Sequence, residues 1–229
     1  MKIGFFYSLV RPLRGCSVDT CRISVNSFDR LAETYAGKYL ALDTYDAYYR
    51  EFCSHVPRQG ATVLDVACGP GNVSAFLVRE RPDLQVLGID LAPNMVRLAQ
   101  THVPSASFLV HDCRHLVDLG RVFDGIAYAF GLNYLNQEDA EQFFRSLGKV
   151  LAPNGVLYLS AMLGPRKRSG LQTSSSGDQI YVHYRPRQEI EHLVQSARLE
   201  VVFSDEIGSP ANASKPTIDV VLVAQRIGT

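Results

Sequence analysis

The sequence predicts an α/β protein with a mostly parallel sheet, and three observations support this fold class. The stretch TVLDVACGPGN at 62–72 has the pattern of a buried strand that runs directly into a glycine turn. The apolar run QVLGID at 85–90 has the pattern of a second strand, which ends in a carboxylate. From there to residue 162, short apolar runs alternate with stretches of helical periodicity. This alternation is typical of parallel strands that are covered by helices on both faces.

The elements are predicted in order along the chain. Aromatic and aliphatic residues recur every three or four positions over 27–56, which predicts a helical segment with a break near Asp43 and Thr44. Residues 1–26 are predicted to form a disordered or loosely docked extension, so that the folded domain covers 27–229. Strands are predicted at 62–67, 85–90, 107–112, 123–130, 156–162 and 180–184, and helices at 72–81, 93–102 and 137–151.

The C-terminal part departs from this alternation. The stretch 164–178 is rich in glycine, serine and charge, and it is predicted to be a loop or small flap. A helix is expected over 186–197. The last two predicted strands, 200–207 and 217–225, are joined by a link without a helical pattern. Because neighbouring strands without a crossover helix are antiparallel, we expect a final hairpin whose last strand runs against the others.

The composition limits the class of partner. The chain has 229 residues, 46% of them hydrophobic, and its 23 basic residues balance 23 acidic ones. A net charge of zero gives no electrostatic basis for binding nucleic acid or an anionic membrane. The basic run 166–168 is interpreted as a solvated loop, and no apolar stretch approaches the roughly 20 residues that span a bilayer. Five cysteines without C-x-x-C spacing predict reduced thiols, no metal site and a cytoplasmic protein.

The glycine turn points to a nucleoside-containing ligand. Glycine lets backbone amides approach a ligand where a strand leads into a helix, and an acid at the end of the next strand suits ribose hydroxyls. Gly69 and Gly71 form this turn, and Asp90 ends the next strand. Asp65, before the turn, would repel a pyrophosphate but attract a cationic amino-acid end. S-adenosyl-L-methionine carries an α-ammonium group and a sulfonium, so it fits this turn better than a nicotinamide dinucleotide does.

With these motifs the chain resembles the class I S-adenosylmethionine-dependent methyltransferases, in particular small bacterial members that act on small molecules. The resemblance covers 27–225. It implies a Rossmann-like fold with a seven-stranded, mostly parallel sheet, a C-terminal antiparallel hairpin and an N-terminal helical lid over 27–56. It also implies methyl transfer to an oxygen or nitrogen of a small-molecule acceptor. The motifs that carry it are VLDVACGPGN at 63–72, LGIDLAPNMV at 87–96, FLVHDCRHL at 108–116, FDGIAYAFGLNYL at 123–135 and LAPNGVLYLS at 151–160.

The resemblance assigns roles to residues at the strand ends. Asp65 and the backbone of Ala67, Gly69 and Gly71 would hold the methionine end of the cofactor, and Asp90 would bind the ribose hydroxyls.

The adenine end and the path to the methyl group are assigned in the same way. Leu91 and Met95 would pack beside the adenine, and Asp112 would accept a hydrogen bond from its amino group, with Cys113 alongside. Phe130 would line the path to the methyl group. Two alternatives stay open, because Asp112 also suits a helix or turn cap and Met95 also suits a helix core.

The acceptor side is predicted from the lid and from two further residues. Tyr35 and Tyr39 share one helix face, and either phenol, or Lys38 between them, could bind the cofactor carboxylate. His183 is the candidate general base for an alcohol or phenol acceptor, although an exposed histidine on an edge strand gives the same pattern. Tyr134 follows the fourth predicted strand, where α/β sheets bind their ligands.

Two rival functions remain, and one subclass is disfavoured. A nicotinamide-dependent oxidoreductase would need a pair such as Tyr-x-x-x-Lys, but the fourth residue after Tyr35 is Tyr39. A non-catalytic protein that binds S-adenosylmethionine would be indicated by a damaged glycine turn, and this turn is intact. The related enzymes that methylate adenine or glutamine often carry Asn/Asp-Pro-Pro-Tyr after the fourth strand. The chain has GLNY at 131–134, which argues against that subclass. The sequence carries no signature of an oligomeric state.

Overall fold

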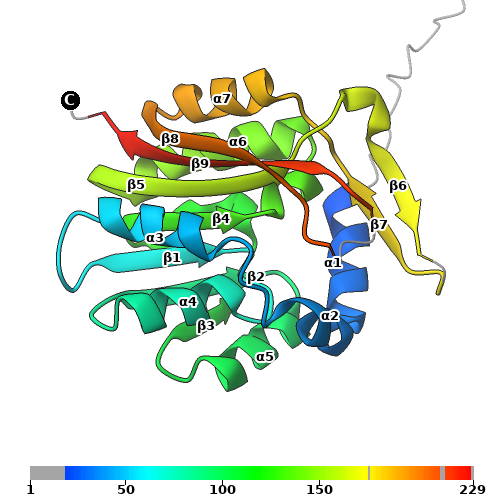
Figure 1. Cartoon of the computed structure of the whole chain (residues 1–229), viewed down its shortest axis with the longest axis horizontal. Helices are drawn as coiled ribbons and strands as arrows, with labels where there is room; N and C mark the ends of the chain where they lie inside the picture. The colour runs from blue at the N-terminus through cyan, green and yellow to red at the C-terminus, as the bar shows by residue number, and fades with distance from the viewer. Residues whose placement is uncertain (1–18, 175, 212–214, 228–229) are drawn as a thin grey trace, which may run out of the picture.

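A seven-stranded sheet lies between two layers of helices (Figure 1). A computed structural model of the chain describes residues 19–174, 176–211 and 215–227. The strand order is β3-β2-β1-β4-β5-β9-β8, and β9 alone runs antiparallel to its neighbours β5 and β8. The predicted fold class and its C-terminal hairpin are therefore confirmed. The strands are β1 Thr62–Val66, β2 Gln85–Asp90, β3 Ser107–Val110, β4 Phe123–Ala129, β5 Leu151–Met162, β8 Leu199–Gly208 and β9 Ile218–Arg226.

Each face of the sheet has its own apolar core. On one face, Tyr49 and Phe52 of α3 contact Tyr158 of β5. On the other face, Phe143 of α6 contacts Tyr128 of β4. Because both faces are covered, the central strands are continuous apolar runs, as parallel strands usually are. One layer contains α3 Asp46–His55, α4 Asn72–Glu80 and α5 Pro93–His102. The other contains α6 Gln137–Val150 and α7 Arg187–Ser196, with the 3₁₀ segment η1 Cys113–Leu119 beside α6.

The glycine turn links β1 to α4. Gly69 and Gly71 have φ angles of 53° and 97°, in the left-handed region that favours glycine. A Cβ atom on Gly71 would lie 3.1 Å from a methyl group of Val103 and 3.3 Å from the backbone of Ala99. Glycine is therefore required at 71 both by the backbone angle and by the close approach of α5.

The N-terminal helices differ from the prediction. Helix α1 Thr20–Arg30 begins inside the predicted extension, and it is followed by α2 Ala32–Tyr39 and then by α3. The carboxylate of Asp19 caps α1 by accepting a hydrogen bond from the Arg22 amide. The buried side of α1 carries small residues, Cys21, Ser24 and Ser27. Helical periodicity in apolar residues therefore did not reveal where α1 begins. Residues 1–18 of the predicted extension lie outside the described part.

A two-stranded antiparallel hairpin projects beside α1 (Figure 1). It consists of β6 Gly170–Thr173 and β7 Gln179–Val182, follows the 3₁₀ turn η3 Arg166–Arg168, and is called the arm below. The prediction of a loop over 164–178 is wrong for β6, because its backbone groups pair with β7 rather than with water. The strand predicted near 180 exists, but it belongs to the arm and not to the main sheet. None of the described helices has the length and apolarity that a membrane crossing requires.

Candidate functional site

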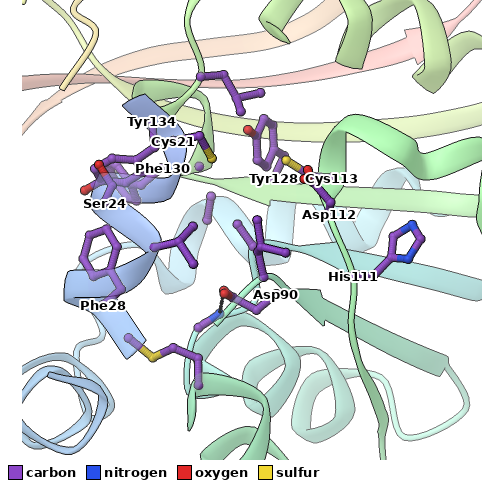
Figure 2. Close-up of a pocket in the computed structure, with 18 of the residues that line it drawn as sticks. Cys21, Ser24, Phe28, Asp90, His111, Asp112, Cys113, Tyr128, Phe130 and Tyr134 are labelled. Carbon is purple, nitrogen blue, oxygen red and sulfur yellow. Dashed lines mark hydrogen bonds between the residues drawn. The ribbon is translucent and has the colours of Figure 1, made fainter. Parts of the chain in front are cut away.

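A cavity lies at the carboxyl ends of β1, β2 and β4 and is covered by α1 (Figure 2). This is the edge at which α/β sheets bind ligands. Five predicted residues from the first two motifs line it: Ala67, Gly69, Asp90, Leu91 and Met95.

Five further predicted residues also line the cavity. Asp112 and Cys113 follow β3, whereas Phe130 and Tyr134 follow β4, and Tyr35 comes from α2. The fold thus brings ten of the predicted residues together around one space.

Asp90 is held in place at the cavity by the glycine turn. One carboxylate oxygen accepts a hydrogen bond from the Gly69 amide at 2.9 Å (Figure 2). The other accepts one from the Ala92 amide at 2.9 Å. Burial raises the pKa of Asp90 above its usual value. The position of an added Cβ on Gly69 meets no heavy atom within 4 Å, so the turn backbone is open on that side. Each Asp90 oxygen accepts one of these amide bonds and retains acceptor capacity for a ligand hydroxyl.

Asp112 caps the segment that follows β3. It accepts a hydrogen bond from the Arg114 amide at 3.0 Å, and it forms an ion pair with the Arg114 guanidinium at 2.7 Å. Burial alone would raise the pKa of Asp112, but the hydrogen bonds from Arg114 lower it below its usual value. Arg114 also pairs with Asp19 and Asp139. The cap that the sequence left open as an alternative is therefore present, and Arg114 joins this wall of the cavity to the start of α1.

Aromatic rings form the opposite end of the cavity. The ring of Phe28 meets those of Tyr134 and Tyr35 edge-on, with centroids 4.9 and 5.8 Å apart. Burial raises the pKa values of both tyrosines well above their usual range. Phe130 has a φ angle of 60°, which is uncommon for a residue with a side chain, and its ring meets Tyr45 at 5.1 Å. This end of the cavity is therefore apolar and made of protonated phenols and phenyl rings.

Asp65 does not line the cavity, contrary to the expectation that it faces the ligand. It is fully buried, and one oxygen accepts hydrogen bonds from the Ser74 amide and hydroxyl at 3.0 and 2.6 Å. Within the described residues its other oxygen, Oδ1, has no hydrogen-bond partner. Burial raises its pKa to about 7. Successive side chains of a strand point to opposite faces, and that of Asp65 points into the layer beneath α4.

His183 also lies away from the cavity. Its Nε2 atom lies 3.1 Å from the Thr20 hydroxyl, and its ring stacks on Tyr181 with centroids 4.6 Å apart. Burial lowers its pKa to about 4. The ring lies against the start of α1, and neither His183 nor Thr20 lines the cavity. The predicted position of a general base beside the methyl group is therefore not observed.

The remaining predicted residues stand behind those that line the cavity. Gly71 packs against α5. Tyr39 packs on Tyr35 with ring centroids 4.7 Å apart, and the Lys38 ammonium lies 4.9 Å from the Tyr39 ring centroid. These three residues do not line the cavity.

Sequence reasoning gave no site role to several residues. Cys21, Ser24 and Val25 of α1 line the cavity but fall within the predicted extension, and Phe28 of α1 lines it as well. Asn133 is a further such residue and is 1% exposed. Its side chain bonds both backbone groups of Met162 and the carbonyl of His183. The sequence signal that could have indicated this linking role is an asparagine soon after a predicted strand.

Comparison with known proteins agrees with this architecture. Residues 63–155 match the family model described as a methyltransferase domain. Over this stretch the chain has a methyltransferase domain, and the resemblance to class I S-adenosylmethionine-dependent methyltransferases that the sequence predicts is confirmed. The family uses S-adenosylmethionine, so the cofactor prediction is confirmed at this level.

Named relatives show how far the likeness extends. A demethylmenaquinone methyltransferase from Thermotoga maritima is 28% identical over 152 residues, which is 65% of this chain and 66% of the relative. A trans-aconitate 2-methyltransferase from Afipia carboxidovorans is 32% identical over 132 residues, 56% of this chain and 49% of the relative. The chain thus matches less than two thirds of the length of either relative. An S-adenosylmethionine-dependent methyltransferase from Clostridium acetobutylicum has a similar fold, with a TM-score of 0.68, 16% identity, and coverage of 88% of this chain and 99% of that one.

Proposed function

We propose that this protein transfers a methyl group from S-adenosylmethionine to a small-molecule acceptor by direct displacement. The observation that carries this proposal is the cavity itself, in which an open glycine-turn backbone, a fixed carboxylate and an apolar aromatic end meet under one helix. When bound, S-adenosylmethionine supplies a methyl group activated by a sulfonium. The chain has to bind this cofactor, exclude water and align the acceptor, and alignment alone can contribute much of the rate.

The residues around Asp90 fit the nucleoside part of the cofactor. We assign the ribose hydroxyls to Asp90, because both of its oxygens are already oriented by backbone amides and a carboxylate is a strong acceptor. Leu91 and Met95 offer apolar contacts for the adenine. Asp112 and Cys113 lie at the same end, and Asp112 is kept ionised by Arg114.

The methionine end is assigned to the open backbone at Ala67 and Gly69 and to the phenol of Tyr35, which stays a hydrogen-bond donor because burial raises its pKa. Asp65 contributes indirectly in this proposal. By accepting two hydrogen bonds from Ser74, it holds the start of α4 against the glycine turn.

Titration calorimetry tests the proposed cofactor. The protein should bind S-adenosylmethionine and S-adenosylhomocysteine, and it should give no heat with NAD. Binding of NAD without binding of S-adenosylhomocysteine would make the protein a nicotinamide enzyme. A search for methylated products in metabolite extracts, with labelled S-adenosylmethionine, then separates an enzyme from a protein that only binds the cofactor.

We also propose a cytoplasmic location. In the described part of the chain, Cys21, Cys53, Cys68 and Cys113 are all free thiols, and reduced thiols are typical of the cytosol. Fractionation of cells that express the full chain, followed by thiol labelling, tests this location.

A further inference from the structure

The cavity has two chemically different ends. Figure 2 shows His111 and Asp112 on one side and Phe28, Phe130 and Tyr134 on the other, with Asp90 between them. The proposed function places the ribose at Asp90 and the adenine beside Asp112. The aromatic end is then left for the methyl group and for the acceptor.

We infer that the acceptor is a flat, uncharged aromatic molecule that is methylated at a neutral nitrogen. This inference rests on the proposed function, and it names the acceptor class for the same cavity.

The shape of the aromatic end suits a planar ring. Phe28 stands nearly perpendicular to Tyr134 and to Tyr35, at interplanar angles of 78° and 88°. Val25 of α1 and Leu135 after β4 add aliphatic lining. Aromatic pairs gain most in offset or edge-on arrangements, and walls of this kind accept a flat apolar molecule between them.

The charges around the cavity disfavour an anionic acceptor. Among the described residues that line it there is no lysine or arginine, and the lining carboxylates are Asp90 and Asp112. The Arg114 guanidinium beside Asp112 is already paired with three carboxylates, and the buried Arg185 guanidinium behind Leu135 pairs with Glu189 and bonds backbone carbonyls. A carboxylate or phosphate acceptor would lose its hydration without gaining a cation from the protein, and burying a charge that no side chain pairs is costly.

The aromatic end also offers no base for an alcohol or phenol. Burial raises the pKa of Cys21 to about 12 and those of Tyr35 and Tyr134 well above their usual range, so all three stay protonated near neutral pH. The Ser24 hydroxyl is bound to both backbone groups of Tyr181.

Burial also raises the pKa values of Cys113 and Tyr128, and the histidines and carboxylates near the cavity are bound elsewhere. His183 bonds Thr20 outside the cavity, and His111 bonds the carbonyl of His115 at the opposite end. Asp90 accepts two backbone amides and Asp112 pairs with Arg114. The acceptor atom must therefore carry a free lone pair without first losing a proton, as an amine or heteroaromatic nitrogen does.

The reaction balances without a protein base. The nitrogen lone pair forms the new N–C bond while the S–C bond breaks, and that bonding pair goes to sulfur, which becomes a neutral thioether. The nitrogen becomes cationic and, where it carries a proton, releases it to water. The faces of Phe28, Tyr35 and Tyr134 can stabilise this positive charge, since aromatic rings attract cations.

A matched set of naphthalenes tests the acceptor class on the full chain. In the presence of S-adenosylhomocysteine, 1-aminonaphthalene and 1-naphthol should bind at pH 7.5, and 1-naphthoate should bind at least about tenfold more weakly because it is an anion. With S-adenosylmethionine, mass spectrometry should detect N-methylation of 1-aminonaphthalene at a rate at least about tenfold above O-methylation of 1-naphthol.

The outcomes separate this inference from the proposed function. Binding of 1-naphthoate as tight as that of 1-aminonaphthalene, faster methylation of 1-naphthol, or no binding of 1-aminonaphthalene overturns the inference and leaves the proposed function standing, provided that S-adenosylhomocysteine binds. If S-adenosylhomocysteine gives no heat, the proposed function itself is wrong.

A variant of Phe28 tests the aromatic wall. Phe28→Leu keeps an apolar side chain but removes the ring, so binding and methylation of 1-aminonaphthalene should both fall about tenfold while S-adenosylhomocysteine binds as before. Phe203→Leu is the matched control, because Phe203 lies on β8 and contacts Tyr48 away from the cavity, and it should leave both values unchanged. Equal behaviour of the two variants would overturn the role of the wall.

Discussion

The glycine-turn edge, formed by Ala67, Gly69, Gly71 and Asp90, and the helix α1 lie on opposite sides of one cavity, but different interactions hold them. At the glycine-turn edge, the Asp90 carboxylate accepts hydrogen bonds from the amides of Gly69 and Ala92. Gly69 is 21 residues from Asp90 in the sequence, and Ala92 is two residues from it. The edge is therefore built from local geometry, and parallel pairing of β1 with β2 brings its parts together.

Helix α1 is held through contacts between distant segments. The Ser24 hydroxyl donates to the Tyr181 carbonyl at 3.2 Å and accepts from the Tyr181 amide at 2.9 Å. The Ser27 hydroxyl donates to the Gln179 carbonyl at 2.5 Å, and Arg30 pairs with Asp178. Ser24 and Ser27 on one face of α1 thus bind the open edge of β7, and Arg30 binds the residue that precedes this strand. Helix α1 and the arm are expected to move as one unit, while the glycine-turn edge stays in place.

The largest expected effect is a pH dependence at Asp65, which lies beneath α4 behind the glycine-turn edge. Burial raises the pKa of Asp65 from 3.8 to about 7. This shift corresponds to a contribution on the order of 4 kcal/mol to the free energy of unfolding. Because the folded state holds this proton more tightly than the unfolded state, Asp65 stabilises the fold below pH 4, and this contribution is lost as the pH rises to about 7. Urea unfolding of the wild type and of Asp65→Asn across this range measures it. Parallel pH profiles of the two proteins would contradict the prediction.

Asp90→Ala should give the next largest effect, on cofactor affinity. Hydrogen bonds to a charged acceptor contribute roughly 1.5–3 kcal/mol each, so the affinity for S-adenosylhomocysteine should fall at least about tenfold. Asp118→Ala is the control, since Asp118 is an exposed aspartate of η1. If titration calorimetry gives the same affinity for wild type and Asp90→Ala, the ribose is bound elsewhere.

Gly71→Ala should destabilise the glycine-turn edge by about 2–3 kcal/mol, because backbone strain and crowding by α5 add. Gly120→Ala is a matched control: its φ angle is also positive, at 61°, but its added Cβ meets nothing within 4 Å. It should cost about 1–2 kcal/mol from strain alone. Equal losses in the free energy of unfolding would show that the approach of α5 has no role.

Ser24→Ala should loosen α1 and the arm without affecting the glycine-turn edge. The substitution leaves the Tyr181 amide and carbonyl without the partner that now satisfies both, which costs about 1–2 kcal/mol. Hydrogen exchange should rise in α1 and β7 and stay constant in α4. Ser54→Ala, which removes a hydroxyl from the exposed side of α3, is the control. Faster exchange in α4 as well would mean that the two regions are not independent.

The smallest effect is a second pH dependence, opposite in sign, at His183 next to the arm, because this side chain is only half-buried and solvent screens much of its interaction. Burial lowers the pKa of His183 to about 4 from its usual 6.5. The unfolded chain therefore takes up this proton first on acidification, and stability is lost as the pH falls from about 6.5 to 4. As the pH falls over this range, the protection factors of α1 and β7, corrected for the intrinsic pH dependence of exchange, should fall more in the wild type than in His183→Gln. A fall of the same size in both proteins would exclude His183 as its cause.

Prediction from sequence succeeded where the site is built from neighbouring segments. Gly69 and Asp90 are close in sequence, and the rule that parallel strands end at one edge places them together. The same rule located Asp112, Phe130 and Tyr134 around the cavity. It did not locate the side chain of Asp65, because the pleat of β1 directs it beneath α4.

The sequence by itself determined the sheet, the glycine turn and the carboxylate that faces it, because apolar periodicity and glycine act over a few residues. Only the tertiary structure decided what covers the cavity and where His183 lies. Ser24 and Tyr181 are 157 residues apart, and serine hydroxyls that bind a distant strand edge leave no periodic pattern in a sequence. The arm pairs with α1 through these hydroxyls, and this pairing directs His183 to Thr20 instead of to the cavity.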